Sequence, residues 1–407
     1  MFTRRLFLLL FVAIAPVLTP AAEAPSRKAI DAAMADLAEV TGFQIKAPLE
    51  FQLITRDQVK IFLSDKMKTG VKPEEIRAEE LTLKMFGFVP QDFDLKKNTL
   101  DLLTEQTAAF YDFHEKKLFI TDWAATKMED EALIHEIAHA LADQNFHLEK
   151  YTRKVEDDSE KSLARQAVVE GQAQWLTRAV LLKRGMTPAT DEAEKSNQKD
   201  DDSPVFDKAP LYFQATLMFP YDVGESFTQA VFERFGKEGF ARVFQHPPVS
   251  AQQILHPEKY FAGVTSLDVD LPVMKGMKRL VEGPVGELDH AILLQQYVGK
   301  EAARDLSPHW RGGSFRIYEK RKRKLDVLVY RSVWSDDASA LWFFGSYEKI
   351  LKAKWKKTNI ASRTDTRIDG KGDDGYFCVD LSATVVTSRE GLPEPCGADL
   401  QIPLSPK

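Results

Sequence analysis

Apolar residues recur at helical spacing in several segments of the first two thirds of the chain. Lys28–Val40 predicts an amphipathic helix, and longer helical patterns cover Ala132–Asn145 and Ser162–Lys183. Leu118–Thr121, rich in β-branched and aromatic residues, predicts a short strand, and Phe51–Ile54 is a short apolar run. This region is therefore expected to combine several helices with a short strand.

The pattern changes after about Val264, where strand signals become frequent. The elements predicted there are a helix at Pro284–Arg304, strands at Ser314–Tyr318, Leu325–Ser332, around Ile368 and within Tyr376–Thr387, and a long helix at Asp336–Lys356. This mixture predicts an antiparallel sheet in an α+β unit. We therefore expect an α+β fold, with one domain over residues 25–264 and a smaller α+β domain over residues 265–407.

Composition narrows the classes of protein that the chain can represent. Of its 407 residues 44% are hydrophobic and 29% charged, which is typical of a folded soluble protein, and the formal net charge is -6. This acidic balance argues against a nucleic-acid partner, and the short apolar runs argue against a multi-span membrane fold. The basic run Arg316–Lys324 is interpreted as a solvated hairpin end, with a contact to an anionic surface as the alternative.

The N-terminus has the features of an export signal. Arg4 and Arg5 precede an apolar run, Leu6–Leu18, and small residues then surround Ala22-Glu23-Ala24. We expect residues 1–24 to be a cleaved signal peptide, although a proline at position 25 disfavours cleavage at that bond and an earlier bond stays open. General secretion is favoured over twin-arginine export, and an uncleaved anchor is the minor alternative. The protein is therefore expected in the periplasm or secreted, without a stable membrane span.

The cysteines agree with an oxidising compartment. Cys378 and Cys396, the chain's only two, are near each other in the sequence. In an exported protein they are expected to form one local disulfide, and two unpaired buried thiols are the alternative.

Candidate chemistry lies in the helix predicted at Ala132–Asn145. It contains His135-Glu136-Ile137-Ala138-His139, and residues four apart on a helix project from one face, so both imidazoles can hold one ion. A catalytic zinc site needs a third protein ligand and an open position for water, whose proton a nearby carboxylate can accept. Glu136 is the predicted general base. The alternative is an amphipathic helix whose two histidines only make hydrogen bonds.

A third ligand is available in the helix predicted at Ser162–Lys183. Glu170 is flanked by apolar or small residues, and a buried carboxylate is costly unless it is paired or bound to a metal. Gly171 and Ala173 are expected to let this helix approach the histidine helix closely. His135, His139 and Glu170 are therefore the predicted ligands of one catalytic Zn²⁺, and a glutamate exposed on the helix surface is the alternative.

His-Glu-x-x-His followed by Glu-Gly-x-Ala resembles the gluzincin zinc metallopeptidases, the thermolysin-like clan. Together with Ala109-Phe110-Tyr111-Asp112, these motifs are also similar to a poorly characterised group of exported bacterial metallopeptidases. The resemblance covers roughly residues 75–265. It implies a zincin fold, in which an active-site helix lies under a small twisted sheet whose edge strand binds an extended peptide. Leu118–Thr121 would be that edge strand.

Several positions depart from the pattern or only extend it. The interval from His139 to Glu170 is longer than in thermolysin-like enzymes, and Gln174 stands where those enzymes have an aspartate that orients a zinc histidine. Asp143 is another candidate to accept a hydrogen bond from a histidine, with a solvated salt bridge as the alternative. For stabilisation of the oxyanion, Tyr221 is favoured over His256, and Tyr221 is expected to open a helix that runs to Phe235.

Three functions are compatible with these residues. The leading expectation is a zinc metallopeptidase acting on a peptide or protein substrate, and a non-enzymatic envelope protein that keeps the fold for binding or assembly is the alternative. A hydrolase of a non-peptide substrate would use the same ligands. The acidic and polar segment Thr187–Pro204 is interpreted as a mobile surface loop, with a lid or a processing site as alternatives.

Overall fold

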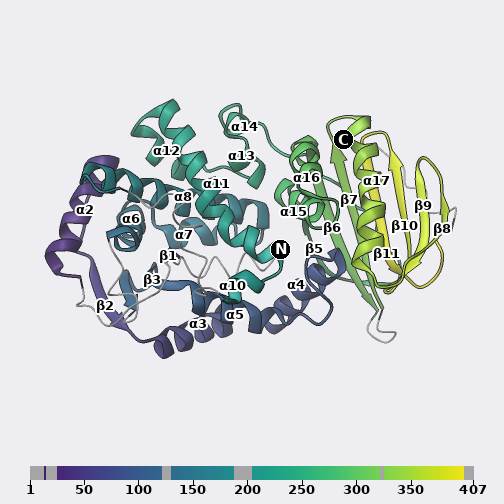
Figure 1. The fold of residues 1–407 in the computed structure, drawn as a ribbon, viewed down its shortest axis with the longest axis horizontal. Coiled ribbons are helices and arrows are strands. Elements are labelled where there is room, and N and C mark those ends of the chain that lie inside the picture. The colour runs from purple at the N-terminus through teal and green to yellow at the C-terminus, as the bar shows by residue number, and fades with distance from the viewer. Residues whose placement is uncertain (1–12, 15–24, 122–129, 188–203, 321–324, 398–407) are drawn as a thin grey trace.

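The computed structural model describes residues 13–14, 25–121, 130–187, 204–320 and 325–397. Figure 1 shows a helical part, purple to teal, joined to a part built on a large sheet, green to yellow. The expected α+β class is confirmed. The interior of the segment Thr187–Pro204, residues 188–203, lies outside the described residues, as do residues 321–324 of the basic run.

The first part combines a small sheet with helices of very different lengths. Its strands are β1 (Ala13–Ile14), β2 (Glu50–Ile54), β3 (Thr107–Asp112) and β4 (Lys117–Thr121). Its helices are α2 (Arg27–Thr41), α3 (Arg56–Gly70), α4 (Pro73–Phe86), α5 (Leu95–Gln106), α6 (Asp130–Phe146), α7 (Leu148–Arg153), α8 (Ser159–Lys183), α10 (Pro204–Lys208), α11 (Leu211–Phe235), α12 (Glu238–Gln245), α13 (Ala251–Leu255) and α14 (Pro257–Phe261). None of the helices in the described part of the chain has the length and apolarity needed to cross a membrane.

The small sheet has the strand order β1-β3-β4-β2 and lies against α6. β3 and β4 form an antiparallel hairpin, while β2 pairs in parallel with the other side of β4. Leu118 and Ile120 of β4 are buried in one cluster with Ile134 and Ile137 of α6, so the alternation of the strand holds the sheet onto the helix. α2 joins this cluster through Ile30 and other residues of its predicted apolar face.

The expectation that Leu118–Thr121 forms an edge strand is wrong. β4 is internal because β2, more than sixty residues earlier in the chain, pairs with its outer side. On the other side of β4 lies β3. The side of β3 that faces away from β4 pairs antiparallel with β1, with Ala13 opposite Ala109. β1 belongs to the predicted signal peptide.

The second part is a seven-stranded antiparallel sheet with the order β5-β6-β7-β11-β10-β9-β8. The strands are β5 (Lys278–Pro284), β6 (Trp310–Lys320), β7 (Leu325–Trp334), β8 (Asn359–Arg363), β9 (Arg367–Gly372), β10 (Gly375–Ser382) and β11 (Val385–Leu392). The helices are α15 (Glu287–Tyr297), α16 (Lys300–Leu306) and α17 (Asp337–Lys354). The helix expected at Pro284–Arg304 is thus two helices, because Gly299, with φ 127°, breaks the pattern.

An apolar contact joins the two parts. Phe86, at the end of α4, packs edge-on against Phe315 of β6 and Tyr330 of β7, with ring centroids 5.6 and 5.5 Å apart. All three rings are buried in one continuous hydrophobic cluster. The large sheet is therefore packed against the helical part as well as linked to it by the chain.

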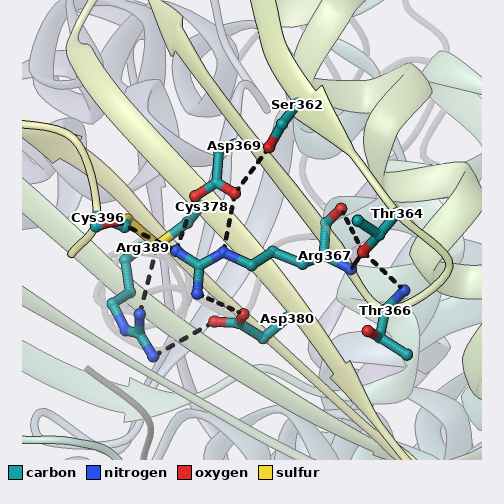
Figure 2. A network of polar contacts seen from close by, with 9 residues as sticks. All are labelled: Ser362, Thr364, Thr366, Arg367, Asp369, Cys378, Asp380, Arg389 and Cys396. Carbon is teal, nitrogen blue, oxygen red and sulfur yellow. Dashed lines mark hydrogen bonds and ion pairs between the residues drawn. A yellow bond between two sulfur atoms is a disulfide. The ribbon is translucent and has the colours of Figure 1, made fainter. Parts of the chain in front are cut away.

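The expected disulfide between Cys378 and Cys396 is present. Figure 2 shows the polar network around it, in which Arg389 donates to Cys378 Sγ at 3.3 Å and lies 3.4 Å from Asp380 Oδ2. Arg367 binds Asp369 and Asp380 and also donates to the carbonyl oxygen of Cys396 at 3.4 Å. Cys396, which follows β11, is thus attached to the sheet by the disulfide and by the contact of its carbonyl oxygen with Arg367.

We expect the double variant Cys378→Ala/Cys396→Ala to lower the free energy of unfolding of this part by about 3 kcal/mol, because the bond closes a short loop of the unfolded chain. The two cysteines are 18 positions apart. Urea unfolding followed by tryptophan fluorescence measures the difference. Wild-type protein in excess reductant is the matched comparison, and equal stability with and without reductant would contradict the prediction.

Candidate metal centre

Helix α6 brings three polar side chains into the interior of the helical part. Leu133, Ile134 and Ile137 bury its apolar face, while His135 and His139 project together with their ring centroids 4.7 Å apart. Both imidazoles are buried. His135, Glu136 and His139 form a group whose donor atoms all lie within 4.8 Å of one another. The helical spacing read from the sequence therefore corresponds to a real cluster of side chains.

Helix α8 supplies the carboxylate that completes the cluster. Its N-terminus is capped by Asp158, whose side chain accepts a hydrogen bond from Lys161 N at 3.1 Å. Glu170, with an exposed fraction of 0%, places Oε2 at 3.1 Å from His135 Nε2 and 3.2 Å from His139 Nε2. Three atoms from two helices thus converge on one point.

This arrangement fits a zinc ion in donor type and in dimensions. Two imidazoles and a carboxylate are a common ligand set of catalytic zinc, and tetrahedral bonds of about 2.0–2.2 Å place neighbouring ligand atoms about 3.3–3.6 Å apart. The two distances to Glu170 Oε2 are close to that separation. The other oxygen, Oε1, is buried and has no hydrogen-bond partner among the described residues. A cation would compensate its burial.

The charges of the cluster favour the forms that bind a metal. Burial raises the pKa of Glu170, but the contacts with His139 and His135 outweigh it, so this pKa lies below its usual value. Burial also lowers the pKa of His139, against the opposing effect of Glu170. A carboxylate and a neutral imidazole are the protonation states required for metal binding.

Glu136 is held by the neighbouring sheet. Its carboxylate is buried, and Oε2 accepts a hydrogen bond from the backbone nitrogen of Tyr111 in β3 at 2.7 Å. The predicted general base is therefore hydrogen-bonded to β3 of the small sheet. The sequence suggested the glutamate from its motif, but the partner of its carboxylate could not be foreseen because it is a backbone group of a remote strand.

Tyr221 lies beside the cluster, but its local structure differs from the prediction. It is in the middle of α11, which begins ten residues earlier at Leu211 and continues through Pro220. The expected start of the helix at Tyr221 is therefore wrong, and Pro220, a residue type that usually interrupts a helix, lies inside it. The tyrosine ring stacks on His135, with centroids 5.9 Å apart and planes 26° apart.

The competing candidate, His256, has a different environment. Its Nε2 is 2.7 Å from Glu287 Oε1 of α15, and Gln252 donates to the other oxygen of Glu287. These contacts tie α13 and α14 to the second part of the molecule. His256 thus has a structural partner, while Tyr221 contacts the cluster.

A glycine contact between helices positions Glu170. Gly171 was expected, together with Ala173, to let α8 approach α6. The nearest neighbour of Gly171 is Gly224 of α11, so the expectation is wrong for this glycine, whereas Ala173 is buried in one cluster with α6. A Cβ atom at position 171 would lie 2.0 Å from the backbone carbon of Gly224, and one at position 224 would lie 2.4 Å from the carbonyl oxygen of Ala167. The two backbones cross in direct contact, immediately beside Glu170 and three residues after Tyr221.

The remaining candidates have distinct surroundings. Asp143 is 2% exposed; its Oδ2 accepts from Tyr111 Oη at 3.0 Å and from Lys116 Nζ at 2.7 Å. It forms a salt bridge, as one alternative proposed, but its carboxylate is buried rather than solvated. Gln174 is half-buried on α8. The neighbouring Gln172, whose role no local sequence pattern indicates, is buried and donates to the carbonyl oxygen of Phe240 at 3.1 Å.

Comparisons with known proteins found one family match and one similar solved structure. Residues 274–400 match a family described as a domain of unknown function (DUF8575), which covers the large sheet and excludes the metal cluster. No curated protein matches the chain. A crystal structure from Chloroflexus aurantiacus, described as a candidate hydrolase with a novel fold, has a TM-score of 0.37 at 17% identity; the match covers 59% of this chain and 92% of that chain.

We expect Gly171→Ala and Gly224→Ala each to lower the free energy of unfolding by about 3 kcal/mol, because the added methyl groups collide with backbone atoms. Gly345, inside α17, is the matched control because nothing lies within 4 Å of its Cβ position. Gly345→Ala should raise the stability by up to about 1 kcal/mol through helix propensity. Chemical denaturation of the three variants tests this, and a neutral effect at positions 171 and 224 would disprove the close crossing.

Proposed function

We propose that this protein is an exported zinc-dependent hydrolase, most specifically a metallopeptidase. The observation that carries the proposal is the convergence of His135 Nε2, His139 Nε2 and Glu170 Oε2, with separations of 3.1 and 3.2 Å to the carboxylate oxygen. In this proposal those three residues hold the ion. Zinc bound there supplies a Lewis acid that polarises a carbonyl group and lowers the pKa of water.

Glu136 and Tyr221 are assigned the proton transfer and the stabilisation of the oxyanion. Glu136 acts as general base: its carboxylate accepts a proton from the attacking water and then passes it to the leaving amine. Its place beside both histidines on α6 supports this role. Tyr221, stacked on His135, is the candidate to donate a hydrogen bond to the oxyanion that forms from the carbonyl group.

The sheet supports a peptide substrate over other hydrolase substrates. β3 is the strand whose backbone reaches Glu136, and its outer side already pairs with a short strand of this chain, β1. An extended peptide in the same place would pair antiparallel with β3 and bring its backbone next to the catalytic group. The disulfide and the N-terminal signal pattern support action outside the cytoplasm.

We expect the Glu136→Gln variant to keep about one zinc per chain while its peptidase activity falls by about 10²–10⁴-fold, since it removes only the base. Glu170→Gln should instead lower zinc affinity by more than about 100-fold, because it weakens a direct ligand. Zinc content of the processed, purified protein and cleavage of a broad panel of unfolded proteins and peptides are measured together.

The outcomes separate the proposed function from its rivals. Cleavage that disappears in Glu136→Gln while zinc remains would support the peptidase. Stoichiometric zinc without cleavage of any peptide would favour a hydrolase of another substrate. Folded wild-type protein that takes up no zinc from an excess would overturn the metal centre and leave the non-enzymatic binding or assembly protein.

A further inference from the structure

Tyr111 is attached to helix α6 at two points. Its backbone nitrogen donates to Glu136 Oε2 at 2.7 Å, and its phenolic oxygen donates to Asp143 Oδ2 at 3.0 Å. Glu136 and Asp143 are seven residues apart, which is about two helical turns, or about 10 Å along the axis. One residue of β3 is thus attached to both ends of the Glu136–Asp143 stretch of α6, which contains His139 and begins directly after His135.

The second attachment point is itself fixed. Besides the tyrosine, the buried carboxylate of Asp143 accepts from Lys116 Nζ at 2.7 Å and, through Oδ1, from Leu148 N at 2.8 Å. The three donors come from β3, from the turn before β4 and from the start of α7. Because Asp143 is held from three directions, a hydroxyl bound to it is a firm anchor for β3.

We propose that Tyr111 is a positioning residue that, through its hydroxyl bond to Asp143, keeps its own N–H on the carboxylate of Glu136. The inference rests on the proposed function, in which Glu136 is the general base. A base must lie within hydrogen-bond reach of the proton that it abstracts, and a displacement of about 1 Å can cost about 100-fold in rate. The hydroxyl fixes the strand, and the strand fixes the carboxylate.

The test compares Tyr111→Phe and Asp143→Asn with Lys116→Met as the matched control. Lys116→Met removes another donor from the same oxygen of Asp143 but leaves both bonds of Tyr111 in place. We expect Tyr111→Phe to lower kcat by about 10-fold or more with KM within about threefold, at unchanged zinc content and melting temperature. Lys116→Met should keep kcat within about threefold, and the double variant Tyr111→Phe/Asp143→Asn should be no worse than its poorer single variant.

Amide hydrogen exchange at position 111 provides a readout that does not require activity. In Tyr111→Phe, with or without zinc, exchange at this amide should rise about 10-fold or more over the wild type, whereas Lys116→Met should leave it unchanged. If the wild type cleaves nothing, the proposed function fails, and exchange still decides whether the hydroxyl holds the strand. An unchanged kcat or an unchanged exchange rate in Tyr111→Phe would overturn the proposal. A loss of kcat in Tyr111→Phe that equals the loss in Lys116→Met would also overturn it. The same holds for a loss of kcat that appears only when zinc or the folded structure is lost.

Discussion

The burial of one carboxylate constrains much of the helical part. Glu170 lies in the interior with an exposed fraction of 0%, and an isolated charge in such a place would be very costly. Both histidines of α6 turn their Nε2 atoms toward it, so α6 and α8 must lie side by side at a set rotation about their axes. The apolar cluster that α6 shares with β4 and α2 then places the small sheet next to the same atoms.

Polar groups around this carboxylate are connected in a chain of contacts that crosses from helix to sheet. Glu136 is bound by a backbone group of β3, and Asp143 collects hydrogen bonds from the same hairpin. The described residues of the large sheet contribute no atom to these contacts. The sheet meets the helical part through apolar rings around Phe86 and through separate polar contacts, such as that of Arg77 with Glu319. The centre and the C-terminal sheet are thus built on separate interactions within one molecule.

Local patterns predicted what local geometry determines. The spacing of His135 and His139 is a property of one helix. The apolar residues next to Glu170 in the sequence predict that its carboxylate is buried. The edge strand, the start of α11 and the partner of Gly171 depend instead on segments that meet only after folding. No local pattern indicates that β2 pairs in parallel with β4. A proline in a helical pattern predicts a helix end, because the packing that lets α11 continue through Pro220 involves residues remote in the sequence.

The contact of Gly171 with Gly224 has a mechanical consequence. Where side chains separate two helices, changes of rotamer can alter the distance between them. At Gly171 and Gly224 the backbones are in direct contact, so no side chain can rearrange there. The contact therefore fixes the position of Glu170 on α8 relative to Tyr221 on α11. A change in the spacing of Glu170 and Tyr221 would therefore require the two helix backbones to move relative to each other at this contact.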